Sequence, residues 1–249
     1  MVERKFEENE KMIIKECIIL GGGNSISNGI SLGLKNRIKD KLVLGCNYSF
    51  KHFDLTTLLF CDKDFYLPMY AKHDKTNPDI YEELKNLPLI IGAKKNPDLD
   101  QFIYPNTTMI ACPKKELGKI PVLTGLFALA IAEKLNPERI FLLGFDWNRR
   151  DPKTIPTGKN YNPNSDLDIH YYGKELKHRG SGYMGFYENH NPSNYFRYFE
   201  KSKSQIFNVS INSNIEDFKK ITYSEFYTLL SNQIFNQDEL RNYIKDKIK

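Results

Sequence analysis

The chain has 249 residues, of which 40% are hydrophobic and 27% are charged, and its formal net charge is +5. This is the composition of a globular domain rather than a disordered or fibrous chain, and no apolar run reaches the ~18 residues that a membrane span needs. The small positive excess suits a ligand that carries phosphates. The 4 cysteines lack C-x-x-C spacing, and the charged N-terminus lacks the apolar core of a signal peptide, so we expect a cytoplasmic protein without a zinc knuckle.

Short apolar runs that are bounded by turn residues are typical of buried parallel strands. Such runs predict strands at 17–20, 42–46, 55–61, 87–93, 108–112, 139–145 and 205–210. Helical patterns predict a helix within 27–39, helices at 122–135, 193–203, 222–231 and 237–248, and a short helix or arm at 1–15. Strands that alternate with helices predict a single α/β domain of Rossmann-like type, with a mostly parallel sheet and helices on both faces.

Ligands of such sheets bind at the carboxyl ends of the strands, so the residues that follow each strand are the first candidates for a site. The first strand runs into Gly21, Gly22, Gly23, Asn24 and Ser25, ahead of a predicted helix. Glycines let a ligand approach the backbone, and the amides at a helix start favour a phosphate. Asn24 and Ser25 would either cap the helix or bind the ligand. The alternative is an ordinary tight turn, and the pattern matches neither G-x-G-x-x-G nor a P-loop.

Five further residues follow strands or open a helix. Asn47 would read a base or a sugar hydroxyl, or is simply a turn residue. Asp62 would bind a ribose, a metal or an acceptor, or cap a helix. Asp146 leaves the most apolar strand, where a carboxylate is costly unless it is paired, so we assign it a functional or site-structuring role. Thr124 and Gly125 open the helix 122–135, where they would bind an anion or allow close packing.

The segment 147–192 is polar and rich in aromatic residues, and a connection of this length is usually functional or disordered. We interpret it as an ordered lid. Tyr171 and Lys174 would bind phosphate oxygens, and His170 or His178 would act as a general base. Lone histidines in a loop are more often bystanders, which is how we interpret His190.

Together these motifs resemble a Rossmann-like superfamily. Its branches are the bacterial lipooligosaccharide sialyltransferases, the motility-accessory-factor-like glycosyltransferases and the MptE-like 6-hydroxymethylpterin pyrophosphokinases. The resemblance covers about 16–215 and rests on the glycine turn at 21–25, on Cys46-Asn47, and on the block from Thr124-Gly125 to Gly144-Phe145-Asp146, which is its most specific part.

The resemblance implies that the glycine turn and Asn47 hold a nucleotide and that tyrosines of the lid hold its phosphate. The family's lid motif His-Tyr-x-Gly-His is matched by His170-Tyr171-Tyr172-Gly173-Lys174, with Lys174 in place of the histidine that supplies the base. The first motif also lacks its proline. We therefore expect nucleotide binding to be kept and do not expect sialyl transfer itself.

The leading hypothesis is a glycosyltransferase that uses a nucleotide-activated sugar, with the base supplied by His170, His178 or Asp62. One alternative is an ATP-dependent pyrophosphokinase, whose magnesium ion would be held by Asp62 and Asp146. The other is a nucleic-acid-binding or nucleic-acid-modifying protein. The acceptor stays open between a glycan, a small molecule and nucleic acid. The C-terminal helices at about 222–249 would either cover the sheet or join two copies in a homo-oligomer.

Overall fold

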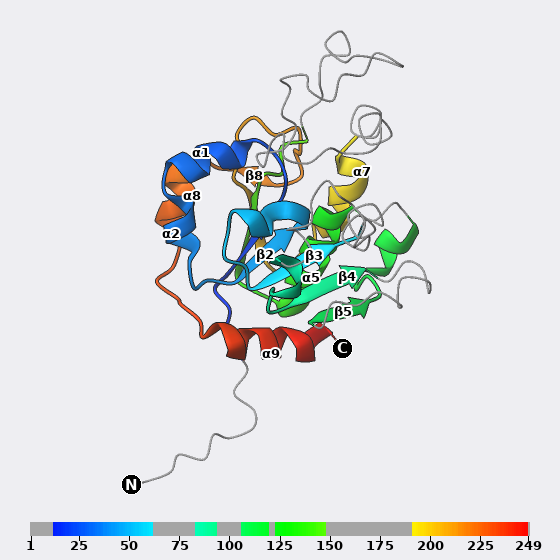
Figure 1. Cartoon of the computed structure of the whole chain (residues 1–249). Helices are drawn as coiled ribbons and strands as arrows, with labels where there is room; N and C mark the ends of the chain where they lie inside the picture. Colours follow the sequence, from blue (N-terminus) through cyan, green and yellow to red (C-terminus); the bar gives the residue numbers. More distant parts are fainter. Residues whose placement is uncertain (1–11, 62–82, 94–105, 120–122, 148–190, 249) are drawn as a thin grey trace, which may run out of the picture.

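The strands align in one parallel sheet at the centre of the molecule (Figure 1). The computed structural model describes residues 12–61, 83–93, 106–119, 123–147 and 191–248. Within them the sheet order is β5-β4-β3-β2-β1-β6-β7-β8, and each neighbouring pair is parallel. The strands are β1 (Glu16–Leu20), β2 (Val43–Cys46), β3 (Thr57–Phe60), β4 (Ile90–Ala93), β5 (Thr107–Ile110), β6 (Arg139–Leu143), β7 (Gln205–Asn208) and β8 (Lys219–Lys220). The predicted α/β fold is therefore confirmed.

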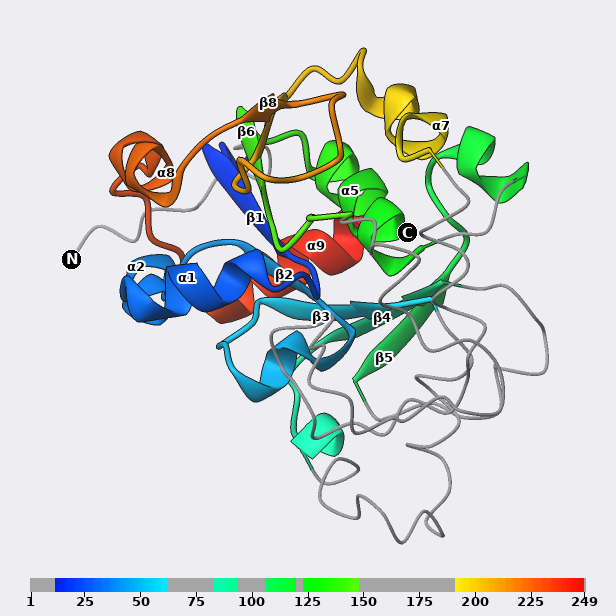
Figure 2. The same ribbon diagram turned by 90° about the horizontal axis from the view of Figure 1, so that it is seen from above.

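Helices cover both faces of the sheet, because successive residues of each central strand face opposite ways and both sets are apolar. In β1, Cys17 and Ile19 join one core, while Ile18 and Leu20 join the other. The first core is closed by α5 (Thr124–Leu135), α7 (Ser193–Phe196) and α9 (Gln237–Ile248). The second is closed by α1 (Ser25–Ser31), α2 (Leu34–Ile38) and α8 (Tyr223–Leu229), and Figure 2 shows the two groups on opposite sides of the sheet.

Several predicted boundaries were wrong for local reasons. One helix was expected within 27–39, but Gly33 has a φ of +81° and separates α1 from α2. The helix expected at 193–203 is α7 followed by the 3-10 turn η7 (Arg197–Phe199). Strand β8 was not expected, because it consists of two lysines. Two further 3-10 turns, η1 (Asn47–Lys51) and η3 (Lys115–Lys119), were also missed. Residues 12–15 are not helical, and the rest of the predicted arm lies outside the described residues.

The C-terminal helices cover the sheet rather than project from it. A buried ionic network ties the segment between α8 and α9 to the amino ends of the strands. Glu16 is 1% exposed and accepts hydrogen bonds from the Ser231 amide at 3.0 Å and the Ser231 hydroxyl at 2.6 Å. Its carboxylate also lies 3.3 Å from Lys41 Nζ and 3.4 Å from Arg139 Nη2. The chain end is thus part of the domain.

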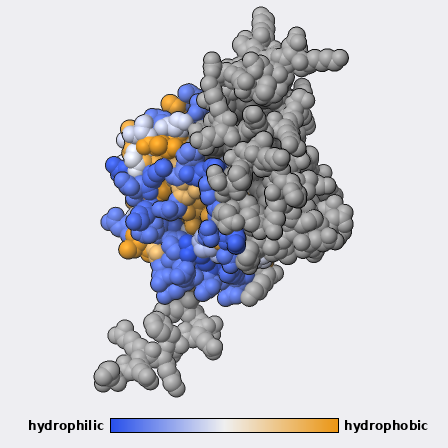
Figure 3. All heavy atoms as spheres, in the orientation of Figure 1, coloured by the Kyte–Doolittle hydropathy of each residue, from blue (hydrophilic) through white to orange (hydrophobic). Residues whose placement is uncertain are grey.

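The surface around these elements is mainly hydrophilic, and Figure 3 shows hydrophobic residues in small groups among polar ones. Among the described residues, the large apolar side chains that are exposed are Ile13, Leu32, Ile211 and Ile234. The helices in the described ranges include none that is long and apolar enough to cross a membrane. Cys17, Cys46 and Cys61 are buried free thiols.

Candidate functional site

The sheet reverses its strand order between β1 and β6. From β1 the chain moves outward through β2 to β5, and β6 then returns to the other side of β1. Crossover connections leave the sheet in opposite directions at such a point, which opens a crevice at the carboxyl ends of the two strands. The glycine turn 21–25 and the segment 144–147 occupy these two ends.

Hydrogen bonds join the glycine turn directly to the end of β6. The Gly21 amide donates to the Leu143 carbonyl at 2.7 Å, and the Gly23 amide donates to the Gly144 carbonyl at 2.8 Å. A Cβ atom at Gly21 would lie 2.6 Å from the Gly144 carbonyl oxygen, and one at Gly23 would lie 2.5 Å from Asp146 Oδ2. Glycine is therefore required at both positions by the close approach of the segment 144–146 that follows β6, whether or not a ligand binds.

Asp146 caps α1 from the far end of β6. The Ser25 amide donates to Asp146 Oδ2 at 2.9 Å, and the carboxylate residue is 7% exposed. The Asn24 side chain was predicted to cap α1, but in this part of the structure it makes no hydrogen bond to a backbone amide of the helix. It accepts a hydrogen bond from the Ser27 hydroxyl at 2.9 Å instead. Asp146 thus pairs its charge with a helix N-terminus, which meets the expectation that a carboxylate at this strand end needs a partner.

These bonds divide the turn into an inner and an outer part. The amides of Gly21, Gly23 and Ser25 are used by β6 and by Asp146. Asn24 is exposed and Gly22 is half-buried, so they form the outward side of the turn. A ligand at this turn would meet the Asn24 side chain and the negative charge of Asp146.

A second polar group lies beside the turn, at the ends of β2 and β3. The Thr124 hydroxyl donates to Asn47 Oδ1 at 3.2 Å and accepts from the Cys61 amide at 3.3 Å. Asn47 has a φ of +50°, a left-handed conformation that asparagine adopts more readily than most residues. The start of α5 therefore contacts the exits of two neighbouring strands.

Gly125 links this group to the end of β6. A Cβ at Gly125 would lie 2.8 Å from Cε1 of Phe145, which precedes Asp146. This contact explains Gly125 by close packing, the simpler of the two predicted roles. The structure thus brings the glycine turn, Asp146, Asn47 and the Thr124-Gly125 pair to one edge of the sheet.

Tyr223 of α8 packs against α1, the helix that follows the glycine turn, and was not predicted. Its ring packs on α1, where a Cβ at Gly29 would lie 2.4 Å from Tyr223 Cε1. Burial raises the pKa of the Tyr223 hydroxyl, and the nearby Tyr227 and Asp146 raise it further.

The loop after β7 was also missed. The Asn208 side-chain amide and the Ser213 hydroxyl donate to the Phe145 carbonyl at 3.0 and 2.7 Å, beneath Asp146. The rule that selects residues after a strand would not have found Asn208, because the predicted strand 205–210 includes it, whereas β7 ends at this residue.

The remaining predicted residues, Asp62, His170, Tyr171, Lys174 and His178, lie outside the described residues. Their assigned roles therefore stay predictions. Within the described part of the chain, no group of three or more His, Cys, Asp or Glu side chains could hold a metal ion.

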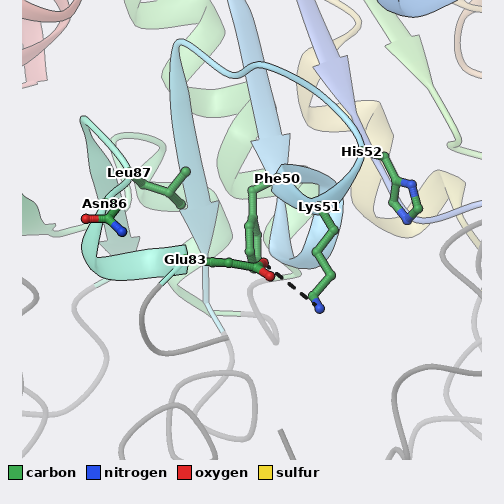
Figure 4. Close-up of a pocket in the computed structure, with 6 residues that line it drawn as sticks. All are labelled: Phe50, Lys51, His52, Glu83, Asn86 and Leu87. Atoms are coloured by element: carbon green, nitrogen blue, oxygen red, sulfur yellow. Dashed lines mark ion pairs between the residues drawn. The ribbon is translucent and has the colours of Figure 1, made fainter. Parts of the chain in front are cut away.

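An open pocket of about 610 Å³ lies beside η1, the turn that begins at Asn47. The described residues that line it are Phe50, Lys51, His52, Glu83, Asn86 and Leu87. Figure 4 shows Lys51 and Glu83 pointing toward each other, and Lys51 Nζ lies 4.0 Å from Glu83 Oε2. The pocket thus combines an apolar wall with both signs of charge close to the exit of β2.

Neither the known family models nor the curated proteins match the chain. The assignment of a function therefore depends on the geometry above and on the motif resemblance.

Proposed function

We propose that the protein is a nucleotide-dependent transferase, namely a glycosyltransferase that uses a nucleotide-activated sugar. The observation that carries this proposal is the meeting of the glycine turn with the Asp146 carboxylate at the β1–β6 switch point. Nucleotides are the ligands that parallel sheets most often bind at this place. Asn47 and Thr124, which contact each other on the same edge, extend the candidate site toward α5.

The charges of the site favour one orientation of the nucleotide. Asp146 places a negative charge at the glycine turn, which would repel a phosphate and attract groups that donate hydrogen bonds. The hydroxyls of a ribose and the amino group of a base are such donors. We therefore assign the nucleoside to the turn, beside Asn24 and Asp146.

The phosphates would then lie at the start of α5. This helix has 12 residues and no acidic residue in its first turn, and the structure records no side-chain cap at its start in the described residues. The N-terminus of such a helix carries a partial positive charge, which stabilises phosphate oxygens. In sugar transfer the nucleotide is the leaving group, so stabilising its phosphates at Thr124 and Gly125 would favour bond cleavage. The base is expected from His170 or His178 of the predicted lid, or from Asp62 after the third predicted strand.

The proposal is tested first by ligand binding. Thermal unfolding would be followed with CMP, UDP, GDP and ATP, each with and without magnesium. A ligand at 100 times its Kd stabilises a protein by about 2.7 kcal/mol. We expect a rise in Tm with CMP or with a nucleoside diphosphate, followed by release of that nucleotide from the matching sugar nucleotide when an acceptor is present.

Variants at the site make the test specific. Asp146→Ala and Asn47→Ala should abolish the Tm rise. Asn106→Ala should keep it, because this exposed asparagine directly precedes β5, the outermost strand of the sheet. Stabilisation by ATP only with magnesium would replace sugar transfer with diphosphate transfer. No rise with any nucleotide would reject the proposal.

A further inference from the structure

Left-handed backbone conformations bracket the segment that carries Asp146. Gly144 has a φ of +73° and Trp147 has a φ of +44°. The first is a glycine, but a bulky residue at positive φ is strained and persists only where its surroundings hold it. Strained backbone conformations are found most often at functional sites, and they persist because neighbouring groups hold them.

Asn214 binds the two main-chain carbonyls that follow the Asp146 side chain. Its backbone amide donates to the Asp146 carbonyl at 2.9 Å, and its side-chain amide donates to the Trp147 carbonyl at 2.8 Å. The Phe145 carbonyl, one residue earlier, is bound by Asn208 and Ser213. Three successive carbonyls are therefore held by the segment 208–214, which begins at the last residue of β7.

The indole ring of Trp147 is fixed separately. It lies 5.7 Å from the ring of Tyr195 and 5.7 Å from the ring of Phe196, both in α7. The aromatic contacts hold the side chain, and Asn214 holds the main chain. Without the second constraint, the strained peptide after Asp146 could relax and carry the carboxylate away from the Ser25 amide.

We propose that Asn214 is a positioning residue of the nucleotide site, which keeps the Asp146 carboxylate on the glycine turn by fixing the main chain around it. This inference rests on the proposed function for its effect on nucleotide binding, and on the geometry alone for its effect on Asp146. Asn214 is exposed, so its role is separable from the hydrophobic core.

The first test compares Asn214→Ala with Asn106→Ala. Both asparagines are exposed and donate a side-chain amide to a carbonyl, Asn106 to Leu87 at 3.1 Å and Asn214 to Trp147 at 2.8 Å. Both variants should lose a similar, small amount of thermal stability. Only Asn214→Ala should bind the nucleotide more weakly, by about fivefold to tenfold, as expected for one lost hydrogen bond.

Two further measurements do not depend on a nucleotide. Trp147 is the single tryptophan of the sequence, so its fluorescence reports on this segment alone. Asn214→Ala should shift the emission and increase quenching by acrylamide, whereas Asn106→Ala should leave both as in the wild type. In addition, the Tm losses of Asn214→Ala and Asp146→Asn should overlap in the double variant, because residues that act through one another are not additive.

The outcomes separate the two proposals. If the wild type binds a nucleotide and Asn214→Ala binds it as tightly as Asn106→Ala does, the positioning role is overturned. If the wild type binds no nucleotide, the proposed function fails. The positioning role is then decided by the Trp147 fluorescence of Asn214→Ala together with the Tm of the double variant. Wild-type emission together with additive Tm losses would then overturn it, and shifted emission with overlapping losses would support it.

Discussion

Asp146 offers the most direct test of the site geometry, because one carboxylate joins the end of β6 to the start of α1. Its hydrogen bond from the Ser25 amide is 2.9 Å long, and the residue is 7% exposed. A hydrogen bond to a charged group contributes about 1.5–3 kcal/mol, and a carboxylate at a helix N-terminus adds about 0.3–1 kcal/mol. The cost of burying the charge offsets part of this sum.

We therefore expect Asp146→Ala to lower the free energy of unfolding by about 2 kcal/mol, which corresponds to a Tm decrease of about 4–8 °C in a chain of this length. Asp146→Asn keeps an acceptor oxygen and loses the charge, so it should cost about half as much. Differential scanning calorimetry measures both, with the exposed Asp54→Asn as a control that leaves Tm unchanged. An Asp146→Ala protein as stable as the wild type would refute the capping role, and equal losses for Ala and Asn would refute the role of the charge.

Three other predictions follow from buried contacts. Glu16→Ala should cost about 3–5 kcal/mol in urea unfolding, because it leaves the Lys41 ammonium buried without its carboxylate; a loss below 1 kcal/mol would contradict this. Gly23→Ala should destabilise by about 1–3 kcal/mol, because its Cβ would lie 2.5 Å from Asp146 Oδ2, and a neutral variant would show that the turn yields easily. In the native protein, a thiol reagent should label Cys112 before the other three cysteines, because those three are buried. Burial also raises the pKa of the Cys112 thiol, so the labelling rate of Cys112 should increase with pH. Rapid labelling of a second cysteine would argue against the described core.

The sequence was sufficient to predict the main strands and the long helices, because these signals are local. A parallel strand buried on both faces is a short apolar run, as in 17–20 and 139–145, and it reads the same whatever surrounds it. Local signals failed where a single backbone conformation mattered. Gly33 interrupts a helical pattern that the side chains would continue, and the two lysines of β8 carry no apolar signal.

The candidate site follows the same division. Strand ends followed by Gly, Asn or Asp placed 21–25, Asn47 and Asp146 at one edge of the sheet, because parallel strands end on the same side. The sequence could not show that Asp146 rather than Asn24 caps α1, since the two bonded residues are 121 positions apart. Nor could it show that Tyr223 packs against α1, or that Asn214 binds the main chain at Asp146 and Trp147, since both residues come from the C-terminal part of the chain. The positions of the strands along the chain and the parallel α/β architecture thus follow from the sequence alone, whereas the order of the strands in the sheet and the partners of each polar group depend on which distant segments the folded chain brings together.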